Sequence, residues 1–263
     1  MQLMDCSTVI VTELYNGGSI DSHLKDMQAL LQSDPQKALT MLSTSFLDLA
    51  SGLKAMHDLG AIHRDIKPGN ILVNVDPSGT IEEAALSDYG LTISTKEAAT
   101  SHPLTTPLFA SPELQRYGNY EILLNKFLES QIQISENPSI NDTSHPFGRL
   151  RSNQSDDIWA LGLTFAMLLL GESHQSINST IRAATNASIW SSLDSAARRK
   201  LFDELFPPPI EVEGNGSPVE LAKIEMHKLC RNMLSLVKAE RYNADQVLAK
   251  CREIHAIIHP QSP

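Results

Sequence analysis

Residues 63–70 read HRDIKPGN, and this stretch decides how the rest of the sequence is interpreted. A second polar motif, DYG, follows at residues 88–90. Two apolar runs flank the turn sequence DPSG at residues 76–79, a pattern that predicts a β-hairpin between the two motifs. Asn70 lies at the start of one hairpin strand and Asp88 just past the end of the other. We therefore expect their side chains to converge from neighbouring strands.

The residue types in these motifs suit the transfer of a phosphoryl group. Such a transfer requires cations to spread the phosphate charge and a carboxylate to orient the attacking hydroxyl. Asp65 and Lys67 supply a carboxylate and a cation, while Asn70 and Asp88 supply hard oxygen ligands. Oxygen ligands of this kind favour Mg²⁺ over Zn²⁺.

The two motifs resemble the signature of the protein kinase family, H-R-D-x-K-x-x-N followed by D-F-G. The resemblance implies that Asp65 is the catalytic base that accepts the proton of the substrate hydroxyl. Lys67 would neutralise the γ-phosphate, and a Lys at this position is typical of serine/threonine kinases. Asn70 and Asp88 would be the Mg²⁺ ligands. Tyr89 replaces the usual Phe and adds a hydroxyl that needs a hydrogen-bond partner.

The resemblance continues into the next loop, where residues 105–113 read TTPLFASPE. This segment is similar to the end of a kinase activation loop, and Ser111 stands where the family usually has Ala. The resemblance implies that Thr106 hydrogen-bonds near Asp65 and Lys67 as part of the catalytic set.

Two further positions match the family's structural residues. Residues 157–162 read DIWALG, which resembles the motif D-x-W-x-x-G, so Asp157 is expected to brace the backbone of the catalytic loop. Arg241 stands where the family places an Arg that pairs with the activation-segment glutamate, here Glu113.

The start of the chain is similar to the edge of a kinase nucleotide site. Residues 9–20 resemble the last strand of the small lobe and the hinge, with Thr12 as gatekeeper. In that case Glu13 and Tyr15 would offer backbone groups to the adenine of ATP, and Leu72 would lie beneath the ring.

The resemblance divides the chain into two parts. Residues 1–18 would be a residual strand of the N-terminal lobe and the hinge, and residues 19–263 the C-terminal lobe, with an insertion within 115–150. A kinase also needs a Gly-rich loop, a strand Lys and a helix Glu to orient ATP. Because about a dozen residues precede the hinge, we expect most of the small lobe to be missing from this chain.

The periodicity of apolar residues predicts a fold of the α+β class that is mainly α. We expect a strand at 7–11, a helix from about 38 to 59, a loop from 92 to 108, and a buried helix that begins at Asp156 or Asp157. The whole would be a kinase-like C-terminal lobe, a helical bundle with a short β-hairpin at the catalytic loop, plus the residual strand and hinge.

Composition restricts the partners and the cellular location that we expect for the protein. The net charge of −10 argues against a nucleic-acid partner. The longest apolar run, residues 158–170, is too short to cross a bilayer, which needs about 20 residues. No secretory signal follows Met1, and the three cysteines show no metal-ligand spacing. The sequence therefore predicts a soluble, cytoplasmic protein without a membrane span.

Three functions fit these observations. The first is an ATP- and Mg²⁺-dependent protein serine/threonine kinase acting on a protein substrate, weak or inactive as this chain alone. The second is a catalytically silent, kinase-like interaction module, because the phosphate loop and its Lys are missing. The third is a small-molecule phosphotransferase of related fold, which also places an Asn after the catalytic Asp at this spacing; Lys67, the segment at 111–113 and Arg241 point away from it.

Overall fold

The computed structural model describes residues 11–98, 105–115, 151–170, 193–210 and 216–260. The predicted strand at 7–11 and the predicted insertion within 115–150 lie outside these ranges except at their edges.

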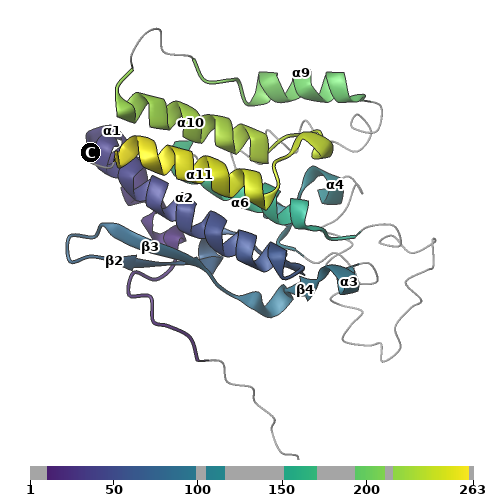
Figure 1. The fold of residues 1–263 in the computed structure, drawn as a ribbon, viewed down its shortest axis with the longest axis horizontal. Helices are drawn as coiled ribbons and strands as arrows, with labels where there is room; N and C mark the ends of the chain where they lie inside the picture. The colour runs from purple at the N-terminus through teal and green to yellow at the C-terminus, as the bar shows by residue number, and fades with distance from the viewer. Residues whose placement is uncertain (1–10, 99–104, 116–150, 171–192, 211–215, 261–263) are drawn as a thin grey trace, which may run out of the picture.

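Four long helices form the body of the molecule: α2 (Pro35–Asp58), α6 (Gln154–Leu170), α10 (Pro218–Met233) and α11 (Ala244–Ile258). In Figure 1, α10, α11 and α2 lie one below the other, with α6 behind them. Helix α11 packs on both α2 and α10, and α10 packs on α6. Every residue of α6 from Asp156 to Leu169 is buried, so this helix is the centre of the core. Within the described residues, no helix combines the length and apolar character that crossing a membrane requires.

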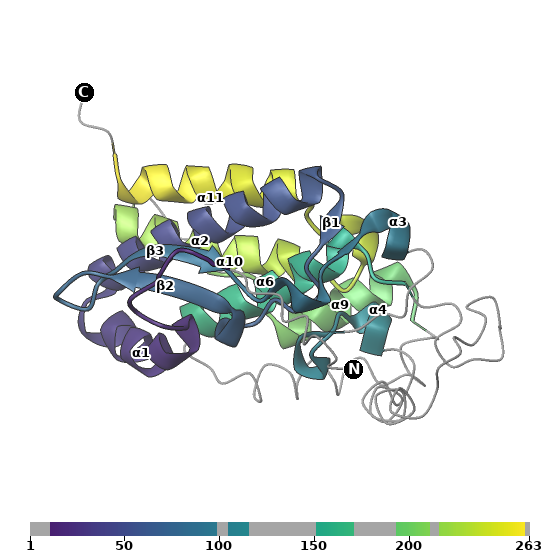
Figure 2. The same cartoon turned by 90° about the horizontal axis from the view of Figure 1, so that it is seen from below.

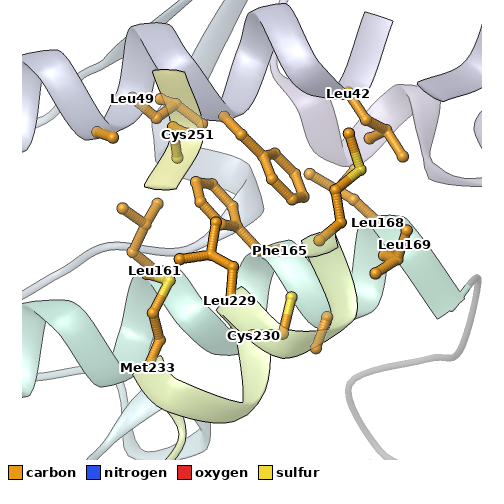
Figure 3. Packing of buried hydrophobic residues seen from close by; sticks show 14 of the residues in the cluster. Leu42, Leu49, Leu161, Phe165, Leu168, Leu169, Leu229, Cys230, Met233 and Cys251 are labelled. Atoms are coloured by element: carbon orange, nitrogen blue, oxygen red, sulfur yellow. The ribbon is translucent and has the colours of Figure 1, made fainter. Parts of the chain in front are cut away.

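Close packing around α6 fixes how these helices meet. The rings of Phe46 on α2 and Phe165 on α6 stack with their centroids 3.6 Å apart. Figure 3 shows Phe165 among Leu161, Leu229 and Cys251, which come from α6, α10 and α11. A Cβ atom at Gly162 would lie 2.6 Å from the Cβ of Met233, so α6 approaches α10 as closely as a glycine allows.

Shorter helices surround this body. Helix α1 (Leu24–Ser33) packs on α2 and α6, and α9 (Ser195–Leu205) lies beyond α10. Two four-residue helices, α3 (Thr95–Ala98) and α4 (Pro112–Gln115), lie toward the end of the molecule opposite α1 (Figure 2).

The predicted hairpin is present. Strands β2 (Ile71–Val75) and β3 (Ile81–Leu86) pair antiparallel, with Ile71 opposite Leu86. The hairpin packs through β3 against α2, on the side away from α10 (Figure 1). The prediction of an α+β fold that is mainly α is therefore confirmed.

The prediction of a loop from residue 92 onward is wrong for its first part. Strand β1 (Ala61–Ile62) pairs with β4 (Ile93–Ser94), and α3 follows directly. The N–H of Thr95 donates to the carbonyl of Gly60 at 2.7 Å, which closes this pairing. Two-residue strands are too short to produce a period in the sequence, so the pattern could not reveal them.

The predicted helices exist, but both begin earlier than expected. Helix α2 begins at Pro35 because Asp34 caps it, accepting a hydrogen bond from the Lys37 N–H at 3.0 Å. Helix α6 begins at Gln154, where Asn153 accepts from the N–H of Ser155 at 3.0 Å. Polar caps lie outside the apolar repeat that marks a helix in the sequence, so the repeat alone places the start too late.

The segment before α1 runs beside the hairpin. The N–H of Gly17 donates to the carbonyl of Val73, and the N–H of Val73 donates to the carbonyl of Gly18, both at 2.9 Å. Ser19 forms an antiparallel bridge with Leu72. A Cβ at Gly17 would lie 2.8 Å from the Val73 carbonyl oxygen, so this close pairing requires a glycine. The predicted hinge is thereby attached to β2.

Candidate active site

The centre of the site is the side chain of Asp65, in the loop between β1 and β2. Its Oδ2 lies 2.7 Å from Nζ of Lys67. Its Oδ1 accepts a hydrogen bond from Oγ1 of Thr106 at 2.5 Å, and the same Oγ1 accepts from Lys67 Nζ at 3.0 Å. The structure thus joins Asp65, Lys67 and Thr106 in one hydrogen-bonded triangle. Asp65 and Thr106 are 41 residues apart along the chain.

Asn70 joins this triangle from the start of β2. Its Nδ2 donates to the backbone carbonyl of Asp65 and to Asp65 Oδ2, both at 2.8 Å. With the amide nitrogen turned toward Asp65, the amide oxygen faces away from it. Within the described part of the chain, that oxygen accepts no hydrogen bond, which leaves it available as a metal ligand.

Asp88 directly follows Ser87, which contacts Asn70. Both the N–H and the Oγ of Ser87 donate to the Asn70 carbonyl at 2.9 Å. Asp88 then adopts a left-handed conformation (φ 60°), and its Oδ1 accepts from the N–H of Gly90 at 3.3 Å. No hydrogen bond joins the side chains of Asp88 and Asn70 in the described residues, so their convergence on one metal stays a prediction.

The described residues contain no cluster of three or more His, Cys, Asp or Glu side chains arranged for a metal ion. The predicted ligand set, one carboxylate and one amide, has too few such side chains to form a cluster of this kind. Such a set leaves most coordination positions to water and substrate phosphates, as Mg²⁺ prefers.

A buried carboxylate on α6 holds the catalytic loop in place. Asp157 accepts from the N–H of His63 at 2.8 Å and from the N–H of Arg64 at 2.9 Å. Its Oδ2 also lies 2.9 Å from Nε2 of His57. Arg64 has a φ of 69°, a left-handed conformation that costs a non-glycine residue roughly 1–2 kcal/mol. The brace expected at Asp157 therefore holds a strained loop.

His63 links the catalytic loop to the loop of Asp88. Its ring is fully buried, with Nε2 3.1 Å from the Ser87 carbonyl and Nδ1 3.3 Å from the N–H of Asp65. The Tyr89 ring lies beside it at a centroid distance of 5.3 Å. The Tyr89 hydroxyl finds a partner in the carbonyl of Leu86 at 2.8 Å, and burial raises the pKa of this tyrosine. His63 is thus a structural residue.

The end of the activation-type segment is anchored by an ion pair. Nη2 of Arg241 lies 3.1 Å from Glu113 Oε2, and the Arg241 side chain is fully buried. Its Nη1 donates to the carbonyl and the Oγ of Ser155, at the start of α6. The guanidinium also lies over the Trp159 ring at 5.1 Å. The predicted pair between Arg241 and Glu113 is present.

The residues expected to contact adenine form a looser group. Glu13 and Thr12 are exposed, and Tyr15 is half-buried, with its hydroxyl 3.4 Å from Glu83 Oε1. Burial and the nearby Glu83 raise the pKa of Tyr15. Leu72 is half-buried in β2, opposite Ser19. The structure attaches Tyr15 to the hairpin through Glu83 and places Leu72 within it, and the roles of all these residues in nucleotide binding stay predictions.

One buried contact was not found from the sequence. Ser111 Oγ donates to Asp156 Oδ1 at 2.6 Å, and both residues are buried. The available signal was the pair of adjacent carboxylates, Asp156 and Asp157, at the start of an apolar helix. The family motif uses only Asp157.

A loop with Asp, Lys and Asn before a β-hairpin, braced from a buried helix, resembles the large lobe of a protein kinase. Residues 4–125 match the sequence model described as "Protein kinase domain". This match covers just under half of the chain, and together with the relatives described next it supports a likeness to the eukaryotic-type protein kinase family.

Three relatives illustrate the likeness. The chain is 28% identical over 63% of its length to the serine/threonine-protein kinase TOS3 of Saccharomyces cerevisiae, and the match covers 22% of that protein. It is 28% identical over 62% of its length to the meiosis-specific serine/threonine-protein kinase mek1 of Schizosaccharomyces pombe, covering 31% of that protein. It is 34% identical over 41% of its length to the probable serine/threonine-protein kinase fhkD of Dictyostelium discoideum, covering 14%. The chain thus spans less than a third of these relatives.

Proposed function

We propose that this chain carries the catalytic lobe of an ATP-dependent protein serine/threonine kinase, which transfers the γ-phosphate of ATP to a Ser or Thr hydroxyl of a protein substrate. The observation that carries the proposal is the triangle of Asp65, Lys67 and Thr106, closed by Asn70. A carboxylate held by three donors at fixed positions can orient a substrate hydroxyl and accept its proton.

Each residue of the triangle has a separate task in this proposal. Asp65 orients the attacking hydroxyl. Lys67, held 2.7 Å from Asp65, places a cation where the transferred phosphate gains charge. Thr106 hydrogen-bonds to both, so it links the segment that would face the substrate to the catalytic loop. Catalysis of this kind is positioning and electrostatic stabilisation rather than covalent chemistry.

The residues present fit a magnesium nucleotide. The amide oxygen of Asn70 and the carboxylate of Asp88 would hold Mg²⁺, whose charge offsets that of the phosphates. The backbone of Glu13 and Tyr15 and the side chain of Leu72 would contact adenine. The hydrogen bond from Asn70 Nδ2 to Asp65 supports this assignment, because it turns the amide oxygen outward.

The decisive experiment measures phosphate incorporation from radiolabelled ATP into casein and myelin basic protein by the full-length protein. We expect Asp65→Asn to lower the rate at least 100-fold, the usual range for removing a general base. Asp76→Asn is the matched control, because Asp76 lies in the exposed hairpin turn and serves only that turn. An Asp65→Asn variant as active as the parent protein would refute the proposal.

A catalytically silent interaction module is the second candidate. It is favoured by the exposure of the adenine edge, where Val11 and Leu14 are 90% and 85% exposed. Calorimetric titration of this chain with Mg·ATP separates the two. Micromolar affinity argues for the kinase, whereas an absence of binding together with no phosphate transfer by the full-length protein argues for the module. The ion pair of Glu113 and Arg241 argues against a small-molecule phosphotransferase.

The setting of the protein is also proposed. Cys230 and Cys251 are free and buried, as expected for a reducing, cytoplasmic environment. The net charge of −10 disfavours a nucleic-acid partner.

A further inference from the structure

Two adjacent carboxylates at the start of α6 serve two different loops. Asp157 binds the backbone of the catalytic loop, as described above. Asp156 Oδ1 accepts a hydrogen bond from the Oγ of Ser111 at 2.6 Å. Asp156 Oδ2 accepts two more from Asn153, one from its N–H at 2.8 Å and one from its Nδ2 at 2.9 Å. The Asp156 carboxylate is therefore held by three donors, one of which comes from 45 residues away.

The contacts with Asn153 have a local explanation. Asn153 caps α6 by accepting from the N–H of Ser155, and Asp156 Oδ2 accepts from the N–H of Asn153, which is one half of a capping box. This accounts for one oxygen of Asp156. The other oxygen, bonded to Ser111, contributes nothing to the cap.

Ser111 is well placed to transmit its position to the catalytic triangle. It is fully buried, and it is separated from Thr106 by the single 3₁₀ turn Pro107–Phe109. That turn is closed by the Phe109 N–H, which donates to the Thr106 carbonyl at 2.9 Å. On its other side, Ser111 accepts from the N–H of Leu114 at 2.9 Å, which begins α4. Ser111 thus lies between the turn that follows Thr106 and the start of α4, so fixing Ser111 restrains the short stretch that links them.

The elements concerned meet around one small cavity of about 10 Å³. Its lining includes Arg64 from the catalytic loop, Thr105 and Ser111 from the segment of Thr106, and both Asp156 and Asp157 from α6. The two carboxylates and the two loops that they hold are therefore immediate neighbours.

We propose that Asp156 is a positioning residue: through Ser111 it fastens the segment that carries Thr106 to α6, so that one helix turn aligns both halves of the catalytic site. Its catalytic consequence rests on the proposed kinase function, whereas the fastening itself does not. A buried, charged side chain adds little net stability, so its value lies in fixing geometry. The pair also marks a departure from the family pattern, because Ser111 stands where Ala is usual.

The fastening is tested by hydrogen exchange of the whole chain, followed by mass spectrometry of the peptide that covers residues 105–114. We expect Ser111→Ala and Asp156→Asn each to raise exchange in this peptide at least tenfold, and the double variant to add nothing further. Exchange in the peptide covering 61–67 should stay unchanged. Ser45→Ala is the matched control, since Ser45 is equally buried but donates within its own helix, to Met41 at 3.0 Å. Unchanged exchange at 105–114 in both single variants would overturn the proposal.

The positioning role is tested by kinetics of the full-length protein on casein. We expect Ser111→Ala to lower kcat about tenfold and to leave the KM for ATP unchanged, because the nucleotide residues are not displaced. Increased exchange without a change in kcat would show that the contact holds the segment without affecting catalysis, and it would overturn the positioning role. If the parent protein transfers no phosphate, the exchange result still decides whether Asp156 fastens the segment, so the failure of each proposal is recognised separately.

Discussion

The two sides proposed for the candidate site, one for the phosphates of ATP and one for its adenine, are built in different ways. On the phosphate side, Asp65, Asn70 and the loops that carry them are buried and hydrogen-bonded to α6 or to one another. On the adenine side, Val11 and Leu14 are almost fully exposed, and the chain is attached to the hairpin from Tyr15 onward. The residues proposed to act in phosphoryl transfer are therefore fixed from inside this lobe, whereas the proposed adenine edge lies on an exposed segment. The changes below should destabilise the first side strongly and the second hardly at all.

The largest effect is expected from Asp157→Ala. This change leaves the buried N–H groups of His63 and Arg64 without partners and removes the support of a strained residue. We expect the free energy of unfolding to fall by about 3–5 kcal/mol. Urea unfolding followed by circular dichroism measures it, with Asp76→Ala in the exposed turn as the control. Equal losses in the two variants would contradict the difference between buried and exposed sides.

A second effect depends on pH and concerns Asp156. Burial, opposed by the hydrogen bond from Ser111, raises the pKa of this carboxyl from 3.8 to about 6, with smaller influences from Glu113 and Lys238. The folded state then binds a proton between about pH 6 and pH 4 that the unfolded state does not. The resulting stability is fully present below pH 3.8 and is lost as the pH rises through about 6, an amount of roughly 3 kcal/mol.

The comparison of the parent protein with Asp156→Asn isolates the stability that comes from the protonation of Asp156. The stability of the parent relative to the variant should rise as the pH falls from 7 to 4, measured by urea unfolding at each pH. Arg64 and Asp157 line the same cavity and are present in both proteins, so the comparison isolates the change at Asp156. A difference that is constant with pH would show that Asp156 titrates near its ordinary value.

A smaller loss is expected from Gly162→Ala, which tests the core behind the phosphate side. The added Cβ would lie 2.6 Å from the Cβ of Met233, so α6 and α10 must separate slightly. Overpacking of this kind costs about 1–3 kcal/mol. Gly52→Ala is the control: Gly52 lies in α2 with open space around it, and there the change should stabilise by up to about 1 kcal/mol. Melting temperatures that fall in both variants would argue against the close helix contact.

The smallest effect is expected at the adenine edge, for Tyr15→Phe. The change removes one long hydrogen bond from the hydroxyl to Glu83 on a half-buried side chain. We expect the free energy of unfolding to change by no more than about 0.5 kcal/mol. A larger loss in chemical denaturation would mean that this edge is held more firmly than the contacts of Tyr15 suggest.

The sequence predicted those features that reside in one short motif or in a long apolar period. The catalytic loop, the hairpin between Asn70 and Asp88, and the buried helix at 158–170 are of this kind. The pairing of β1 with β4 was missed because two-residue strands have no period. The bond from Ser111 to Asp156 was missed for another reason: Ser111 departs from the family pattern and Asp156 stands outside the family motif, but nothing in the sequence links the two, and their proximity is a consequence of tertiary packing.

The tandem aspartates also constrain how α6 can vary. Successive residues of an α-helix are rotated by roughly 100° about its axis, which is why Asp156 and Asp157 can face separate loops. Inserting or deleting one residue ahead of them in this first turn would swing both side chains away from their partners together. The length of that turn is therefore fixed by two independent requirements, and we expect variation in chain length to fall on the residues before Asn153 instead.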